Sequence, residues 1–412
     1  MERIDADLLI PGRGEPVAEG CVLFEGGRIH YAGPAAQAPE APVTTTSRAA
    51  AVLPGLWDCH SHLMGLPPSS GMNLQVLTTE PLATRGARCA RDLRAALDAG
   101  ITSVREVGGI GVHVARAVEE GTIEGPTVYA AGAVLSTTGG HGDVHAVPLE
   151  WMHDLSMTGA DFRLCDGVDE CMKATREQLR RNARVIKVCA SGGVLSEVDH
   201  PMHQQFTVAE MRAVVEVAGM AERVVAAHCH GKAGIMAALE AGVRTIEHGS
   251  YLDEEACDAM LETGAVLVAT RLIIEDLLAA SHTMPPYAAT KLAALADQHA
   301  QAVALAHSKG VTFATGTDVV ASSPAAPSAW GSNARELSLL VSLGFTPLQA
   351  IEAATANGPL TVGPQAPRTG QLRADHEADL ITLDADPIAD ISVLTDPDHV
   401  VGVWKSGRRV KG

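Results

Sequence analysis

Eight short segments rich in Val, Ile, Thr and Ala recur along this chain, and most follow a helix-like stretch that ends in Gly or a polar turn. The segments are AVLPGLWDCH, ITSVREVG, TVYAAGAVLS, RVIKVCASGG, RVVAAHCH, VRTIEHGS, AVLVATRL and VTFATGTD. Between them lie runs with apolar residues at helical spacing, such as ARCARDLRAALDAG and AGIMAALEAG. Eight strand–helix pairs predict a closed parallel α/β fold, the (β/α)8 TIM barrel. An open doubly wound sheet is disfavoured, because no G-x-G-x-x-G turn follows the first strand.

Both ends of the chain depart from this alternation. The stretches VLFEGGRIHYAGP, ADLITLDAD and VVGVWKSGRRV are typical of short strands joined by Gly-rich turns. We therefore expect a small β-sandwich domain formed by residues 1–50 and 365–412, with the barrel spanning residues 51–364. Long loops are expected after the first, third and fourth strands, at 63–86, 137–170 and 194–207, where they would form the rim of the barrel.

The overall charge limits the partners of the chain. Its formal net charge is -18 and it has no run of Lys and Arg, so it would repel nucleic-acid phosphates and anionic lipids. No apolar stretch reaches the roughly 18 residues needed to span a bilayer, and the first residues lack the pattern of a signal peptide. We expect a soluble, cytoplasmic protein; a secreted or periplasmic one would require that a signal peptide had been removed.

Residue types that bind metals occur where the predicted barrel strands end. In LWDCHSH, two histidines stand one residue apart, so in a strand they project from the same face. Taken alone, this pair could equally be two partly buried histidines. Five metal-binding side chains at strand ends and one lysine within a strand, however, can converge on one point: His60 and His62 on the first strand, Lys187 on the fourth, His228 on the fifth, His248 on the sixth and Asp318 on the eighth.

This pattern resembles the amidohydrolase superfamily, the metal-dependent hydrolases built on a (β/α)8 barrel. The resemblance runs from LPGLWDCHSH to GTD and includes the terminal stretch ADLITLDADP. The motifs IKVCASGGVLS, AAHCHGKAG and RTIEHGS look most like the subgroup of prolidase-like and N-acyl-amino-acid-hydrolysing members, which includes the ochratoxin-degrading amidohydrolases.

The resemblance implies two metal ions. His60, His62 and Asp318 would hold one of them, His228 and His248 the other, and a carboxylated Lys187 would bridge the two. Imidazole and carboxylate ligands suit Zn²⁺, which we expect, although Mn²⁺ and Fe²⁺ fit the same ligand types. Burial favours the neutral amine that reacts with CO₂; the alternative is a buried lysine paired with Asp or Glu. Asp318 would also be the catalytic proton carrier, or else only a ligand or a helix N-cap.

Three further residues are candidates for binding substrate. His230 should face the same side as His228, and His141 lies in the glycine-rich stretch GGHGD of a rim loop. Each could instead be a structural histidine. Arg271, at the end of the seventh strand, is a candidate partner for a substrate carboxylate.

The subgroup resemblance implies hydrolysis of the amide between an acyl group and a C-terminal amino acid, that is, of a small N-acyl amino acid or dipeptide. The specific expectation is cleavage of ochratoxin A to ochratoxin α and phenylalanine. The alternatives are an Xaa-Pro dipeptidase and a hydrolase of cyclic amides like imidazolonepropionase. A catalytically inactive scaffold is disfavoured because no ligand of the pattern is missing. Such barrels usually form homo-oligomers, which we expect here.

Overall fold

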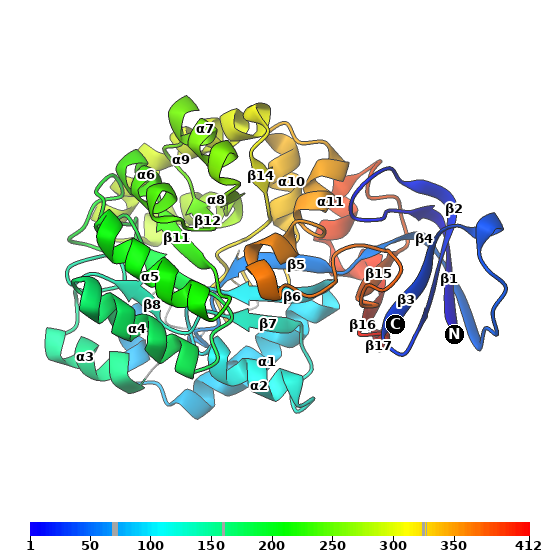
Figure 1. Ribbon diagram of the computed structural model, residues 1–412, viewed down its shortest axis with the longest axis horizontal. Helices are drawn as coiled ribbons and strands as arrows, with labels where there is room; N and C mark the ends of the chain where they lie inside the picture. The colour runs from blue at the N-terminus through cyan, green and yellow to red at the C-terminus, as the bar shows by residue number, and fades with distance from the viewer. Residues whose placement is uncertain (68–72, 159–160, 324–325, 327) are drawn as a thin grey trace.

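The protein consists of a barrel with a smaller β-domain on one side, and both chain termini lie in that β-domain (Figure 1). The computed structural model describes residues 1–67, 73–158, 161–323, 326 and 328–412. Residues 68–72 of the first expected loop and 159–160 of the second therefore lie outside the described residues. Within the described ranges, no helix is both long and apolar enough to cross a membrane.

A seven-stranded mixed sheet forms the small domain, with strand order β17-β16-β15-β4-β1-β2-β3. β1 and β4 pair in parallel, and the other pairs are antiparallel. Phe24 and Trp404 pack edge to face at 6.4 Å, so strands from the two ends of the chain share one core. The strands are β1 (Glu2–Leu9), β2 (Val17–Glu25), β3 (Arg28–Pro34), β4 (Thr45–Pro54), β15 (Leu380–Leu383), β16 (Val400–Lys405) and β17 (Arg408–Lys411).

The barrel strands form two parallel sheets. One has the order β5-β6-β7 and the other β14-β13-β12-β11-β10-β8-β9. Their bounds are β5 (Leu56–Ser61), β6 (Ile101–Glu106), β7 (Thr127–Ala130), β8 (Val134–Ser136), β9 (Phe162–Leu164), β10 (Ile186–Cys189), β11 (Val225–Cys229), β12 (Thr245–His248), β13 (Val266–Val268) and β14 (Thr312–Phe313).

Backbone hydrogen bonds join the two sheets into one barrel. The N–H of Cys59 in β5 donates to the carbonyl of Thr315, just after β14, at 2.8 Å, and the N–H of Asp318 donates to the carbonyl of His60 at 2.7 Å. On the other side, the N–H of Arg184 donates to the carbonyl of Ala130 in β7 at 2.8 Å. The predicted (β/α)8 barrel with a β-domain from both termini is confirmed, whereas the division at residues 50/51 and 364/365 stays a prediction.

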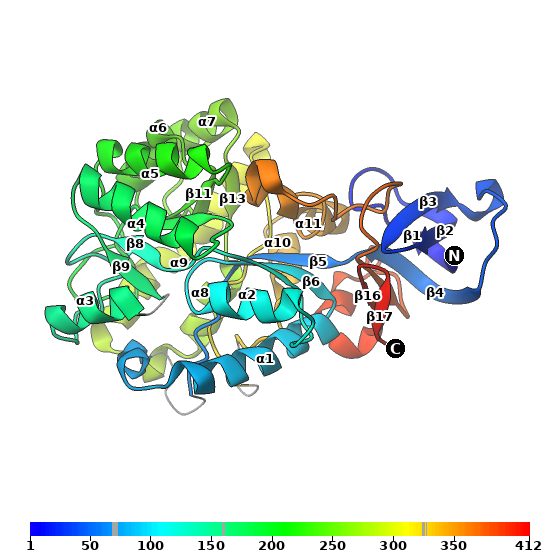
Figure 2. The ribbon, with the colours of Figure 1, turned by 60° about the horizontal axis from the view of Figure 1, so that its bottom comes forward.

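Helices surround the strands, as Figures 1 and 2 show from two directions. In α1 the buried residues Cys89, Leu93, Ala96 and Leu97 follow helical spacing, which places one apolar face on the barrel. The helices are α1 (Leu82–Asp98), α2 (Gly111–Glu119), α3 (Leu149–Thr158), α4 (Val168–Arg180), α5 (Val208–Met220), α6 (Lys232–Ala241), α7 (Glu254–Thr263), α8 (Arg271–Ala279), α9 (Pro286–Lys309), α10 (Arg335–Ser342) and α11 (Pro347–Ala353).

The third predicted strand, TVYAAGAVLS, is divided into β7 and β8. Gly132 lies between them with a φ of 73°, a left-handed conformation that interrupts a strand. The expected loop after this strand also contains α3 and the additional strand β9. In the sheet, β8, the second half of the predicted third strand, lies between β9 and β10.

Candidate active site

His60, His62 and Asp318 form the first group of metal-ligand side chains. Their ligand atoms all lie within 4.8 Å of one another. The Asp318 carboxylate is 3.1 Å from Nε2 of His62 and 3.6 Å from Nε2 of His60. Burial lowers the pKa of His60 to about 4. Burial alone would raise the pKa of Asp318, but the two imidazoles outweigh it and lower that pKa to about 2, so the carboxylate is ionised at neutral pH.

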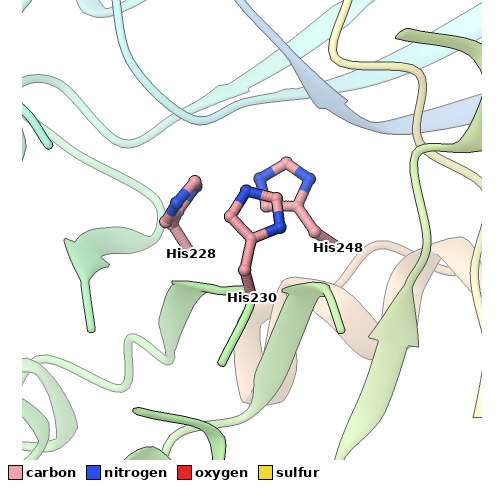
Figure 3. Close-up of side chains that lie close together, drawn as sticks. All are labelled: His228, His230 and His248. Carbon is pink, nitrogen blue, oxygen red and sulfur yellow. The ribbon is translucent and has the colours of Figure 1, made fainter. Parts of the chain in front are cut away.

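His228, His230 and His248 form the second group. Figure 3 shows the three rings gathered at the ends of β11 and β12, and their ligand atoms lie within 4.8 Å of one another. Burial lowers the pKa of each ring well below its usual value, which keeps the rings neutral. The rings of His60 and His248 are 5.0 Å apart, so the two groups adjoin.

The hydrogen bonds of His62 and His228 determine which nitrogen of each ring can bind a metal. Nδ1 of His62 lies 2.7 Å from the carbonyl of Gly108, and Nε2 of His228 lies 3.1 Å from the carbonyl of Gly192. Because a carbonyl only accepts, each of these nitrogens carries a proton and donates. Nε2 of His62 and Nδ1 of His228 then each have a free lone pair. Both rings are therefore in the tautomer that binding a metal requires.

The same argument applies to His248. Its Nδ1 lies 2.7 Å from Oγ1 of Thr270, whose own proton goes to the carbonyl of Ala269 at 2.7 Å. Thr270 therefore accepts from His248, and Nε2 of the ring is free. His248, Thr270 and Asp318 have φ values of 70°, 54° and 60°, respectively. Three residues other than Gly in the left-handed region at one place indicate a functional site.

His60 is held by a buried ion pair between Glu247 and Arg105. Its Nδ1 lies 2.7 Å from Oε2 of Glu247, and Arg105 donates to both oxygens of Glu247 at 2.7 and 2.8 Å. All three side chains are at most 1% exposed. Burial alone would raise the pKa of Glu247, but Arg105 and His60 hold it well below its usual range. The charged carboxylate orients His60.

Replacing Arg105 with Ala should destabilise the protein strongly. Glu247 would be left as a buried charge without its cation, which typically costs about 3–5 kcal/mol of the free energy of unfolding. Urea unfolding of the metal-free protein measures this change, because bound metal would add its own stabilisation. The exposed Arg116, paired with Glu120, is the matched control and should change little on the same substitution. A small loss for Arg105→Ala would contradict the prediction.

Lys187 lies in β10 with its side chain directed into the barrel. Its Nζ is buried and has no hydrogen-bond partner among the described residues. Burial lowers its pKa, which favours the neutral amine. Asp318 and Glu247 both act electrostatically on this amine, so it lies close to the first group. An unpaired buried amine beside neutral imidazoles and a carboxylate fits a pair of divalent cations bridged by a lysine carbamate.

The structure also positions the three expected substrate-binding residues. The ring of His141 stacks on that of His228 with centroids 4.2 Å apart, and His230 lies within the second group. Arg271 begins α8, where its guanidinium donates to Glu275 at 2.5 Å and to the carbonyl of Ala296 at 2.8 Å. These contacts turn Arg271 towards α8 and α9. Its role in binding a substrate carboxylate stays a prediction, and its observed partners do not favour it.

Residues 51–410 match the amidohydrolase family. The chain belongs to the amidohydrolase family. It is 44% identical to ochratoxinase from Aspergillus niger over 423 residues, covering 99% of this chain and 86% of that protein. With the two groups of ligand residues, this membership makes the protein a metal-dependent amidohydrolase similar to ochratoxinase.

Solved structures of an ochratoxinase, a prolidase and a dipeptidase share the whole fold. The crystal structure of A. niger ochratoxinase has a TM-score of 0.93 at 43% identity, covering 100% of this chain and 95% of that one. A prolidase complexed with N-methylphosphonate-L-proline has a TM-score of 0.89 at 31% identity, covering 100% and 99%. A Xaa-Pro dipeptidase with bound methionine has a TM-score of 0.86 at 28% identity, covering 100% of both chains.

Sequence reasoning missed the residues that orient the amidohydrolase site. Arg105 and Glu247 were not singled out, although a charged residue within an apolar strand, as in ITSVREVG and TIEH, signals a buried ion pair. Thr270 and the carbonyls of Gly108 and Gly192 carry no such signal. Every residue has a backbone carbonyl, and the sequence does not show which carbonyl will accept a hydrogen bond from a histidine ring.

Proposed function

We propose that this protein hydrolyses the amide between an acyl group and a C-terminal amino acid, and that it cleaves ochratoxin A to ochratoxin α and phenylalanine. The proposal rests on the two adjoining groups of ligand residues in a chain that is 44% identical to ochratoxinase. The ring centroids of His60, in the first group, and His248, in the second, are 5.0 Å apart. A small amide is the substrate class that both ochratoxinase and the prolidases suggest.

In this proposal His60, His62 and Asp318 would hold one metal ion, His228 and His248 would hold the other, and a carboxylated Lys187 would join them. Zn²⁺ is the proposed metal, since neutral imidazole and carboxylate are ligands it favours. When bound, the two ions would polarise the amide carbonyl and lower the pKa of the attacking water.

A homo-oligomeric state also stays a prediction.

The chain's own residues would carry the proton. The ionised carboxylate of Asp318 accepts a proton from the attacking water at one of its oxygens and later gives it to the departing amide nitrogen. His230 contacts the substrate, and Glu247 keeps His60 oriented through its 2.7 Å hydrogen bond. Neutral rings and a low-pKa carboxylate support this division of roles.

A second candidate is an Xaa-Pro dipeptidase. It is favoured by the 31% identity to a prolidase whose crystal structure contains N-methylphosphonate-L-proline. Both candidates break an amide next to a free carboxylate. They differ in the amide nitrogen, which carries a hydrogen in ochratoxin A and none in a prolyl amide.

The metal-loaded protein should release phenylalanine from ochratoxin A, and chelation should abolish the reaction until metal is restored. Mass spectrometry of the products, with a Xaa-Pro dipeptide and a cyclic amide tested in parallel, measures the specificity. Metal analysis of the same sample should find about two ions per chain. Hydrolysis of the dipeptide or of the cyclic amide alone would replace the proposed function with that alternative.

A further inference from the structure

His141 is fixed beside the two ligand groups by residues of a different loop. Its ring lies nearly parallel to that of His228, with the ring centroids 4.2 Å apart and an angle of 23° between the planes. Nδ1 of His141 lies 2.9 Å from Oγ of Ser196. Nε2 has no hydrogen-bond partner among the described residues.

Asp199 determines the direction of this hydrogen bond. Its carboxylate accepts from the N–H of Gly193 and from Nε2 of Gln205, both at 3.0 Å, and the Lys291 ammonium lies 3.5 Å away. The hydroxyl of Ser196 also donates to this carboxylate. Every group facing Asp199 is a donor, as an ionised carboxylate requires.

Ser196 has a single proton, and Asp199 receives it. Oγ of Ser196 can therefore only accept from His141, so Nδ1 of His141 carries the ring proton. Nε2 is then a bare lone pair. Gln205 adds a second restraint, since its Oε1 accepts the backbone N–H of His141 at 3.1 Å.

The loop that carries Ser196 is itself fixed. The ammonium of Lys291, on α9, donates to the carbonyls of Gly193, Ser196 and Asp199 at 3.3, 2.7 and 2.5 Å. A Cβ on Gly193 would lie 2.1 Å from Nδ1 and Cε1 of His141, so the glycine allows the ring to pack directly on the loop. The lone pair of His141 is thus held in one orientation.

An N-acyl amino acid has three polar groups near the bond that breaks. The carbonyl oxygen and the carboxylate are acceptors and would be repelled by a lone pair, whereas the amide N–H is a donor that matches it. We propose that Nε2 of His141 accepts the amide N–H of the substrate, and that the enzyme thereby selects secondary amides over the tertiary amides of proline. This inference rests on the proposed hydrolysis of acyl amino acids. His141 is then a specificity-determining residue, and Ser196 and Asp199 position it.

The test compares ochratoxin A with an analogue methylated on the amide nitrogen, which lacks only the N–H. In the parent enzyme kcat/KM should favour ochratoxin A. His141→Ala should lower kcat/KM for ochratoxin A by about ten-fold, the worth of one such hydrogen bond, and leave the methylated analogue nearly unchanged. Equal losses on both substrates, or a parent that prefers the methylated amide, would overturn the inference. If the metal-loaded parent cleaves no ochratoxin A, the proposed function fails and the inference with it.

Ser196 supplies an independent measurement. Ser196→Ala should reduce the preference for the secondary amide, and Ser196→Thr should restore it because the hydroxyl returns. Ser308→Ala, an exposed serine on α9, is the control and should leave the preference unchanged. ¹⁵N NMR of histidine-labelled protein should show His141 protonated at Nδ1, and Ser196→Ala should remove that signature, with His141→Ala assigning the signal. Protonation at Nε2 in the parent would refute the proposal even where the methylated substrate is not cleaved.

Discussion

Replacing Lys187 with Ala should remove most of the bound metal and lower kcat/KM for ochratoxin A by about 10²-fold or more, because loss of a residue that only orients a metal ligand already costs about 10- to 100-fold. The amine is buried in β10 without a hydrogen-bond partner, and burial lowers its pKa. A neutral amine attacks CO₂ to give a carbamate and a proton, which converts an unpaired nitrogen into an anion able to join two cations.

Metal analysis and the carbamate signal separate this role from a structural one. ¹³C-labelled bicarbonate should give a carbamate resonance in the parent that is absent in Lys187→Ala. Short carboxylic acids such as acetate should partly restore both metal and activity to the variant. Lys173→Ala, on the exposed face of α4, is the matched control and should retain both. A Lys187→Ala protein that keeps two metals and full turnover would exclude the bridging role.

The barrel could be predicted because its signals are local. Each β-strand is a short apolar run bounded by turn residues, and eight repeats of one pattern leave few alternative folds. The small additions could not be predicted in this way. β9 has three residues, too few to show a period, and the break between β7 and β8 depends on the backbone conformation of Gly132.

The candidate ligands could be placed from the sequence because parallel strands bring their carboxyl ends to the same edge. Because His60, His228 and Asp318 stand at the ends of predicted strands, their proximity could be predicted without knowing how the side chains pack. The orientation of each ring could not be predicted. Ser196 and His141 are 55 residues apart, and only the packing of their loops sets the direction of the hydrogen bond between them.

The position of Asp318 could be predicted from the sequence, but its protonation state could not. Its place after β14 follows from the sequence, whereas its ionised state follows from the neighbouring imidazoles that lower its pKa to about 2. It also has a φ of 60°, a conformation that Asp and Asn adopt more readily than most residues. Asn at this position therefore keeps the backbone, the size and one oxygen, and removes the negative charge together with the capacity to carry a proton.

Asp318→Asn should lower kcat by about 10²- to 10⁴-fold, the usual worth of general acid–base catalysis, while most of the metal stays bound. An amide nitrogen leaves poorly unless it is protonated, so the loss of the proton carrier should affect kcat more than KM. The measurement is steady-state hydrolysis of ochratoxin A by variants matched for metal content. Asp258→Asn, an exposed carboxylate paired with Lys309, is the control and should behave as the parent. If the metal-replete Asp318→Asn enzyme turns over within a few-fold of the parent, another group carries the proton. His230 is then the next residue to test, because its ring lies in the second group 4.8 Å from that of His248.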